Sequence, residues 1–294
     1  MDFQSIALPT ELWYLRCFAT AKIQHFLLLQ QKKIFFFKIN FSSLIISIFA
    51  EKKAMDHIIT IDIGNTRSKY AIFNGDAIAE IGTFDPYTDD LRQVTSRYPE
   101  MKKGIISSVG GKIGECLEQL SELEVLILSG NTPLPFKLGY ERKDQVGSDR
   151  LVAVAAAMKK KPGQNNLIID IGTCITYDIL TDENIHLGGA ISPGINLRFK
   201  AMNDYTEKLP LCSPTLYEIK YICNSTEECL NAGVIGGITH EMEGFINKYS
   251  SLYKDLNIFI IGGDNIFFEN RLKNCIFADS KFTFNGLKFI LDYQ

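Results

Sequence analysis

Short apolar runs of strand type alternate with amphipathic stretches of helical type after residue 57. The run from Ile58 to Ile63 is rich in β-branched residues and leads through a Gly-Asn-Thr turn into a second apolar strand that ends near Ile72. Three strands and two helices are predicted next. The strands cover 77–84, 104–109 and 125–128, and the helices cover 88–98 and 113–120. This order of elements is typical of an α/β domain in layers.

The opening pattern returns 108 residues later. An apolar strand, Asp-Ile-Gly, a turn with Thr and a second strand make up Leu167 to Asp178, as they make up Ile58 to Ile72. One such turn alone would be an ordinary hairpin, but two copies that each follow an apolar strand indicate an internal duplication. We therefore predict two half-domains that flank a cleft, each offering one Asp to a shared ligand.

The elements around and after the second copy continue the alternation. Helices are predicted over 151–158, 197–202 and 224–249, and strands over 185–191 and 256–261. The first of these helices is rich in Ala, so we expect it to pack closely against a neighbour. Ser225 or Thr226 is predicted to cap the long helix, and the glycines inside that helix predict a close neighbour there. These glycines are Gly233, Gly236 and Gly237.

The same patterns divide the chain into three parts. We predict an extension over 1–54, a first half over 55–162 and a second half over 163–294. The extension carries a net charge of +4, and its apolar run resembles a signal peptide but is short for a transmembrane helix. Met55 stands directly before the first strand, so we expect the protein to start there or the extension to be poorly ordered. A membrane anchor is the alternative.

Charge and cysteine usage exclude some classes of function. Residues 55–294 carry a net charge of −7 and no stripe rich in Lys or Arg, which argues against nonspecific binding of nucleic acid. The seven cysteines form no CxxC pair and have no His-rich surroundings. This usage is typical of reduced thiols in a cytoplasmic protein rather than of disulfides or a zinc site.

The first turn carries candidate chemistry. Asp62 lies in an apolar strand, where a carboxylate is expensive to bury unless a cation or hydrogen-bond donors meet it. The turn from Gly64 to Thr66 offers backbone N–H groups and a hydroxyl, and Arg67 and Lys69 follow. Such a group of residues suits a metal-bound polyphosphate.

Two glycine-rich segments predict close approaches of the backbone. Gly262 and Gly263 follow the last predicted strand, where a flat group such as adenine would lie against bare backbone. The segment from Gly188 to Gly194 also allows close backbone approach, and its Pro193 suits the first turn of a helix.

The segment from Gly147 to Arg150 permits two interpretations. In one, Ser148 or Asp149 is a helix N-cap and Arg150 is a solvated charge. In the other, Asp149 is a functional acid beside a cation. The spacing alone leaves both open.

Taken in order, these motifs closely resemble the type III pantothenate kinases. That family belongs to the superfamily of acetate kinase, sugar kinases, the heat-shock chaperone ATPase and actin. The resemblance covers 55–294 and none of the extension. The motifs that carry it are DIGNTRSK at 62–69, GSDR at 147–150, DIGTCITYD at 170–178, GGAISPG at 188–194, Asn-Ser-Thr at 224–226 and GGD at 262–264.

The resemblance implies two duplicated ribonuclease-H-like half-domains, as in the actin-like ATPases, around an ATP cleft. It implies phosphorylation of pantothenate by ATP, the first step of coenzyme A biosynthesis, in a cytoplasmic homodimer that uses Mg²⁺ and a monovalent cation, K⁺ or NH₄⁺. Asp149 would be the general base. The ATP-binding residues would be Asp62, Ile63, Gly64, Asn65, Thr66, Arg67, Ser68, Lys69 and Thr173. The substrate-binding residues would be Tyr140, Gly147, Ser148, Asp149, Arg150 and Thr226. Asp170 would hold the monovalent cation, and Asp62 would hold Mg²⁺ through water.

Two alternatives remain at this stage. One is a small-substrate sugar or acetate kinase of the same superfamily, although the body of the chain is short for those enzymes. The other is a regulatory relative without catalytic activity. The retained charges of Asp62, Asp149, Arg150 and Asp170 argue against it, since a protein without catalysis has no need of four costly charges at one cleft.

Overall fold

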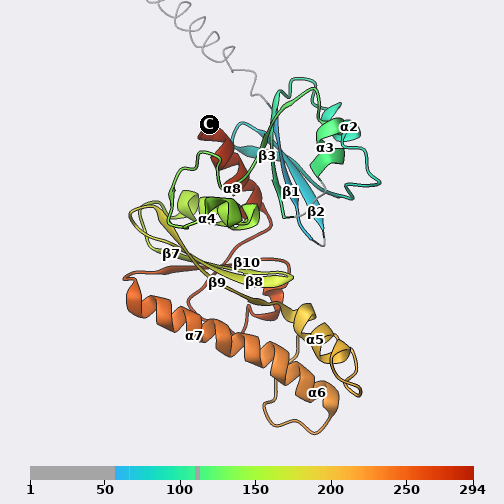
Figure 1. Cartoon of the computed structure of the whole chain (residues 1–294), viewed down its shortest axis with the longest axis vertical. Coiled ribbons are helices and arrows are strands. Elements are labelled where there is room, and N and C mark those ends of the chain that lie inside the picture. The colour runs from blue at the N-terminus through green and yellow to red at the C-terminus, as the bar shows by residue number, and fades with distance from the viewer. Residues whose placement is uncertain (1–56, 66, 110–112) are drawn as a thin grey trace, which may run out of the picture. The chain divides into compact units, whose positions relative to one another are not determined.

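Two mixed β-sheets with the same strand topology organise the protein (Figure 1). The computed structural model describes residues 57–65, 67–109 and 113–294. The predictions made for residues 1–54 and for Thr66 lie outside them. Residues 56–294 form one compact unit.

The described elements follow in chain order. The strands are β1 (His57–Ile63), β2 (Ser68–Asn74), β3 (Ala77–Phe84), β4 (Lys103–Ser108), β5 (Glu124–Ile127), β6 (Lys137–Leu138), β7 (Asn166–Ile171), β8 (Cys174–Leu180), β9 (Ile185–Pro193), β10 (Asn257–Ile261) and β11 (Ile276–Phe277). The α-helices are α2 (Arg92–Thr95), α3 (Ile113–Gln119), α4 (Ser148–Lys160), α5 (Ile195–Asp204), α6 (Thr226–Asn231), α7 (Gly237–Leu252) and α8 (Lys281–Asp292). Short 3₁₀ turns η1 (Lys143–Gln145) and η3 (Asn265–Phe267) and a π-helical segment η2 (Ala232–Gly236) complete the list.

The strand order shows the duplication directly. The first sheet has the order β3-β2-β1-β4-β5, and the second has β11-β10-β7-β8-β9-β6. In each, an antiparallel meander of three strands is followed by two strands parallel to its first, and the second sheet adds β6 at its edge. The predicted α/β fold of two duplicated ribonuclease-H-like halves is therefore confirmed. The domain boundary at 162/163 stays a prediction.

One apolar core joins the facing sides of the two sheets through α4 and α8. It contains the Ala-rich run of α4 together with residues of β1, β2, β7 and β10 (Figure 1). Gly286 of α8 has its bare Cα against the Val152 carbonyl of α4, where a Cβ would collide. The close packing predicted for the Ala-rich helix is thus present, and α8 is its neighbour.

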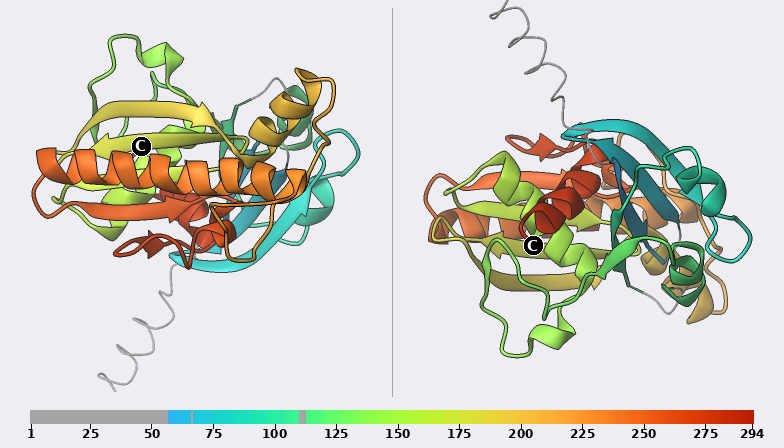
Figure 2. Two further views of the ribbon diagram at one scale, coloured as in Figure 1. Left: turned by 90° about the horizontal axis from the view of Figure 1, so that it is seen from below. Right: turned by 90° about the horizontal axis from the view of Figure 1, so that it is seen from above.

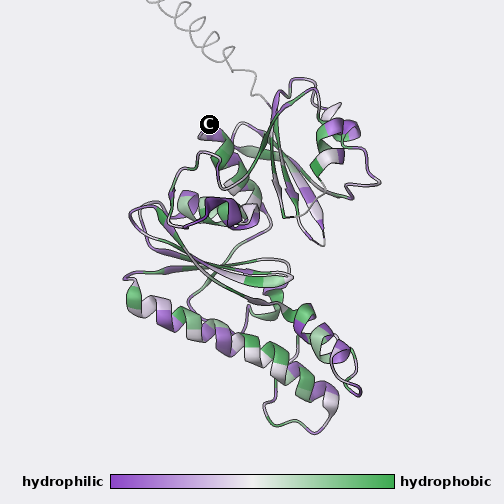
Figure 3. Cartoon of the chain, in the orientation of Figure 1, coloured by the Kyte–Doolittle hydropathy of each residue, from purple (hydrophilic) through white to green (hydrophobic). Residues whose placement is uncertain are grey.

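A second core lies on the other face of the second sheet. There α5, α6 and α7 pack against Leu167, Ile169 and Tyr177, whose side chains alternate with those facing α4. Figure 2 shows α7 lying across this face, and Figure 3 shows hydrophobic and hydrophilic residues alternating along that helix. No described helix has the length and apolar character needed to cross a membrane.

Several element predictions need correction. The helix expected over 88–98 is reduced to Arg92–Thr95. Pro193 ends β9 rather than opening a helix, and α5 begins at Ile195 with Gly194 as N-cap.

The long helix expected over 224–249 is divided. Ser225 caps α6 by accepting the Glu228 N–H, as predicted, but a π-helical segment then separates α6 from α7. A Cβ on Gly233 or Gly237 would meet nothing within 4 Å, so the close neighbour predicted for them is wrong. A Cβ on Gly236 would lie 3.0 Å from the Tyr221 ring, so of the three glycines Gly236 alone has the predicted close neighbour. The widened helical turn, rather than close packing, accompanies these glycines.

Candidate active site

The first hairpin presents Asp62 beside a cation. Asp62 is the Cα partner of Lys69 on β2 and of Ser107 on β4. The turn closes through a hydrogen bond of 3.2 Å that the Gly64 N–H donates to the Arg67 carbonyl. The loop therefore holds a carboxylate and two basic side chains at one end of the first sheet.

The side chains predicted to bind ATP differ in exposure. Asn65 and Arg67 are exposed, whereas Ile63 and Ser68 are buried in the protein. Ile63 and Ser68 thus offer only backbone groups to a ligand. Thr66, between them, lies outside the described residues.

The second hairpin presents Asp170 at the end of β7. Its Cα partner on β8 is Thr176, and the predicted ATP residue Thr173 is exposed in the intervening turn. Gly194 donates its N–H to the Thr173 carbonyl over 3.0 Å, and its bare Cα lies against the Gly172 carbonyl. A side chain at Gly194 would push this turn away, so the close approach predicted for the segment 188–194 is present here.

The two glycines after β10 differ in their surroundings. Gly262 has φ of +99°, and its bare Cα faces the Ile171 carbonyl and the Asp170 carboxylate. This face of Gly262 therefore packs against the second hairpin. Gly263 has open space where a Cβ would stand.

Three predicted carboxylates lie close enough to affect one another's charge. Burial, followed by the charge of Asp149, raises the pKa of Asp62 to about 6, against the opposing charge of Lys69. Burial, followed by the charges of Asp149 and Asp62, raises the pKa of Asp170 to about 7. Both side chains keep some exposed surface, but dense surrounding protein removes most of their solvation. The two hairpins and the start of α4 thus converge on one acidic site.

Asp149 lies at the start of α4 but is not the N-cap of that helix. The N-cap is Gly147, and the Asp149 Oδ1 accepts the backbone N–H of Arg150 over 2.9 Å. Burial raises the pKa of Asp149 and outweighs the hydrogen bond and the charge of Arg150, which lower it. Desolvation is therefore the largest influence on the pKa of Asp149, ahead of its contacts with Arg150.

The Ser148 side chain joins α4 to the first sheet. Its buried hydroxyl donates to the Ser108 carbonyl over 2.9 Å and accepts from the Ser108 N–H and the Ser107 hydroxyl, both over 3.0 Å. These contacts satisfy the hydroxyl within the protein. Ser148 is thus neither the N-cap nor, through its side chain, free for a ligand.

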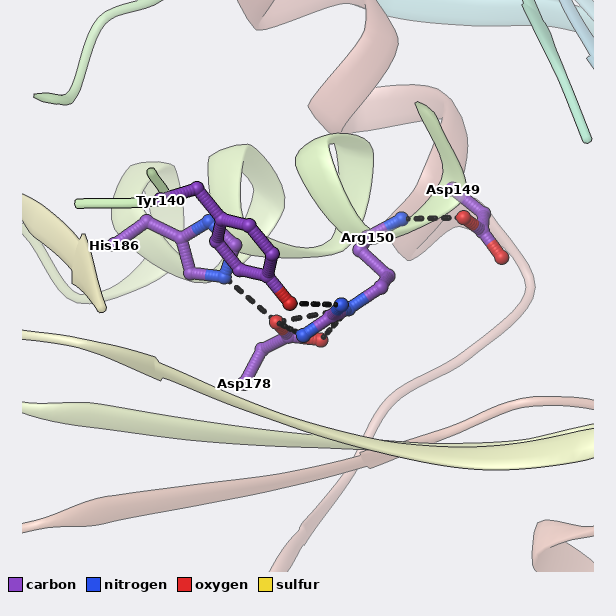
Figure 4. A network of polar contacts seen from close by, with 5 residues as sticks. All are labelled: Tyr140, Asp149, Arg150, Asp178 and His186. Atoms are coloured by element: carbon purple, nitrogen blue, oxygen red, sulfur yellow. Dashed lines mark hydrogen bonds and ion pairs between the residues drawn. The ribbon is translucent and has the colours of Figure 1, made fainter. Parts of the chain in front are cut away.

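Arg150 is buried and paired, so its interpretation as a solvated charge is wrong. Only 6% of the residue is exposed. Its guanidinium donates to the Asp178 carboxylate and, over 2.7 Å, to the hydroxyl of Tyr140 (Figure 4). The structure therefore brings together the predicted residues Tyr140, Asp149 and Arg150.

Sequence reasoning assigned no role to Asp178 or His186, which complete this network. Both are buried in strands of the second sheet. A signal was present in the sequence, since Asp178 is a carboxylate in an apolar strand, as Asp62 is. The same cost of burial that singled out Asp62 applies to Asp178.

Thr226 is a predicted site residue that lies apart from this group within one chain. It is the exposed first residue of α6, which packs on the face of the second sheet opposite α4 (Figures 1 and 2). Within one chain, Thr226 and Asp149 are therefore on opposite sides of that sheet.

Asp62 and Asp170 suit a cation that takes its remaining ligands from water and phosphate oxygens. The described residues contain no cluster of three His, Cys, Asp or Glu side chains arranged around a metal. The charge of Asp62 contributes to the raised pKa of Asp170, and a bound cation would remove this cost. Mg²⁺ commonly keeps several waters and binds through one or two carboxylates plus phosphate oxygens, so the pair fits such an ion.

Comparison with known proteins identifies the relatives of this chain. The sequence model of a family described as type III pantothenate kinase matches residues 58–248. A type III pantothenate kinase of Christiangramia forsetii is 40% identical over 239 residues, which cover 80% of this chain and 98% of that protein. One of Phocaeicola vulgatus is 41% identical with the same coverage. A solved structure from Campylobacter jejuni, described as a Baf family transcriptional activator, superposes with a TM-score of 0.54 at 21% identity over 80% of this chain and 98% of that one.

Proposed function

The chain belongs to the type III pantothenate kinase family, and from this premise we propose that it transfers the γ-phosphoryl group of ATP to the terminal hydroxyl of pantothenate. The product is 4'-phosphopantothenate, and the reaction opens coenzyme A biosynthesis. The observation that carries the proposal is the convergence of Asp62, Asp149 and Asp170 from the two hairpins and the start of α4. Phosphoryl transfer depends mainly on positioning and charge compensation, which such a site supplies.

In the proposed step, Asp149 orients the hydroxyl of pantothenate and accepts its proton. The hydroxyl oxygen forms a bond to the γ-phosphorus while the bond to the β,γ-bridging oxygen breaks, and ADP leaves with that electron pair. Burial raises the pKa of Asp149, which makes its ionised form a stronger base than an exposed carboxylate.

The first hairpin is proposed to bind ATP. The exposed Arg67 and the half-buried Lys69 compensate phosphate charge, and the backbone of the turn offers N–H donors. When bound, Mg²⁺ at Asp62 and a monovalent cation at Asp170 would compensate the remaining negative charge between phosphates and carboxylates. Thr173 in the second hairpin is proposed to contact ATP from the opposite side.

Pantothenate is proposed to lie along the segment from Gly147 to Arg150, with the Tyr140 hydroxyl beside it. Thr226 joins this site only in a homodimer, since in one chain α6 and α4 are on opposite faces of the sheet. We therefore propose a homodimer in which a second copy supplies Thr226. The cytoplasmic location follows from the reduced cysteines and remains a prediction.

Two other functions would fit the same fold. A regulatory relative would keep the sheets without turnover, and the Campylobacter jejuni structure supports the fold alone. A small sugar or acetate kinase would use the same carboxylates on another hydroxyl. Membership of the family favours pantothenate over both.

Release of ADP by a protein of residues 55–294 with ATP, Mg²⁺ and pantothenate tests the proposal. Parallel reactions contain K⁺ or Na⁺ as the only monovalent cation. We expect turnover that depends on pantothenate and is fastest with K⁺. A folded protein that binds ATP but releases no ADP in either salt would contradict the kinase function, and equal rates in both salts would contradict the cation site.

A further inference from the structure

Some N–H donors of the Arg150 guanidinium are hydrogen-bonded to protein groups, and others have no partner among the described residues. Its Nε donates to both oxygens of Asp178, over 3.1 and 3.0 Å, and its Nη2 donates to Oδ1 over 2.6 Å. Its Nη1 donates to the Tyr140 hydroxyl over 2.7 Å, and the guanidinium carbon lies 5.4 Å from the centre of the Tyr140 ring. These bonds use three of the five N–H donors of an arginine. Within the described part of the chain the other two have no hydrogen-bond partner, so they are available to a substrate acceptor.

Asp178 is a buried charge that requires this partner. It is 1% exposed in the middle of β8. Burial alone would raise its pKa, but hydrogen bonds from His186 and Arg150 hold that pKa below its usual value. Asp178 is therefore ionised, and its two oxygens hold the guanidinium in a plane fixed by the sheet.

His186 holds Asp178 from the other side. The imidazole is fully buried on β9, and its Nε2 lies 2.6 Å from the Asp178 Oδ1. Because an ionised carboxylate only accepts hydrogen bonds, Nε2 carries the proton. The Nδ1 has no partner among the described residues, which is consistent with a lone pair there rather than a second buried N–H.

Tyr140 is located by the same residues. Its ring centre lies 6.0 Å from that of His186. The ring also packs against Gly188, whose φ of +85° and missing Cβ leave room for it. The hydroxyl of Tyr140 and the guanidinium of Arg150 thus have fixed positions relative to one support on β8 and β9 (Figure 4).

We propose that Asp178, held by His186, is a positioning residue that fixes Arg150 and Tyr140 for the acceptor substrate. This inference rests on the proposed function, in which Arg150 and Tyr140 meet pantothenate. Asp178 touches no substrate. It orients the two free N–H donors of Arg150, and loss of its charge would release the guanidinium from the direction that suits the substrate.

The first test is Asp178→Asn, which keeps the volume and removes the charge. We expect KM for pantothenate to rise about 10-fold or more, while KM for ATP stays within about twofold, because the ATP site uses other residues. Asp292→Asn is the matched control, since Asp292 pairs with the buried Lys288 on α8, outside the site. The control should alter stability without changing either KM.

A second pair of variants covers the case in which Asp178→Asn does not fold, since it leaves a buried guanidinium without its counterion. His186→Gln retains an N–H donor near the Nε2 position, whereas His186→Leu removes it. We expect His186→Gln to resemble the wild type and His186→Leu to raise KM for pantothenate selectively.

The outcomes separate this inference from the proposed function. A folded Asp178→Asn with both KM values unchanged, or equal KM values for the two His186 variants, would overturn the positioning role. Wild-type protein that phosphorylates no pantothenate would overturn the proposed function and this inference with it.

Discussion

The two Asp-Ile-Gly hairpins have the same backbone arrangement and different charges. Asp62 faces Lys69 across the first hairpin, whereas Asp170 faces the neutral Thr176 across the second. The segment 62–69 contains an Arg and a Lys, and the segment 170–178 contains neither. The first hairpin is thus suited to phosphate and the second to a cation.

A second difference lies inside the returning strands. Ala71 of β2 pairs with Thr60, and Asp178 of β8 pairs with Ile168, two residues before the Asp of each repeat. Both positions are buried, but the second holds a carboxylate. The helix α4, which follows the first repeat in sequence, supplies Arg150 as its counterion. The two repeats therefore share one backbone arrangement. They differ in buried charge, and the helix α4 between them in sequence supplies the counterion for the second repeat.

The largest effect should come from Asp149, which influences the carboxylates of both hairpins. Asp149→Asn should lower kcat by about 10²- to 10⁴-fold, the contribution typical of a general base. ATP binding should remain close to normal, because the hairpins are intact. Steady-state ADP release and nucleotide titration measure the two quantities. A kcat within about threefold of wild type would remove Asp149 from the base role.

The difference between Ala71 and Asp178 can be tested by making the first repeat resemble the second. Ala71→Asp would bury a carboxylate on β2 without the arginine that Asp178 has. We expect a loss of about 3–5 kcal/mol in the free energy of unfolding, measured by urea denaturation. Ala71→Ser is the control for size and should cost less. Equal losses for the two variants would show that this position tolerates charge without a counterion.

The raised pKa of Asp170 predicts a dependence of stability on pH. An unfolded Asp ionises near pH 4, whereas folded Asp170 keeps its proton until about pH 7, so stability in the absence of ligands should fall as pH rises between these values. Asp170→Asn should therefore increase the free energy of unfolding by about 2–4 kcal/mol at pH 7.5 and have little effect at pH 4.

The measurement is urea denaturation at both pH values without nucleotide or divalent cation. Asp62→Asn is the comparison, with a smaller gain because the pKa of Asp62 is raised only to about 6. An identical effect of Asp170→Asn at the two pH values would contradict the assignment.

The sequence predicted the parts of the site that recur or follow a motif. The two hairpins were predicted because each follows an apolar strand interrupted by an Asp, and Asp149 was placed at a helix start. The functional roles of Asp62, Asp149 and Asp170 stay predictions. The elements from β1 to β5 follow the predicted order of strands and helices, whereas β6 was not predicted. Short-range patterns of polarity were sufficient for these elements.

The network around Arg150 could not be predicted in the same way. Arg150 and Asp178 are 28 residues apart, and their contact depends on how α4 packs against β8. The sequence showed a charged pair at a helix start and gave no indication of burial. Ser148 was one of two candidate caps in one interpretation of the sequence, and its actual partner Ser108 lies 40 residues earlier. Tertiary packing, rather than local preference, decides these side chains.

The smallest expected effect concerns a hydrogen bond from a tyrosine hydroxyl to a carboxylate, which both hairpins have. Tyr70 and Tyr177 are matched in the repeats, and each hydroxyl donates to a carboxylate, Glu80 over 2.7 Å and Glu241 over 2.9 Å. Each of these carboxylates also accepts from an arginine and another hydroxyl, so it stays satisfied when the tyrosine hydroxyl is lost. Tyr70→Phe and Tyr177→Phe should therefore each lower the free energy of unfolding by about 1 kcal/mol, the net value of one such bond. Thermal or urea unfolding of the two variants in parallel measures this. A clearly larger loss for Tyr177→Phe would mean that the second hairpin depends on this support more than the first, and that the repeats differ in stability as well as in charge.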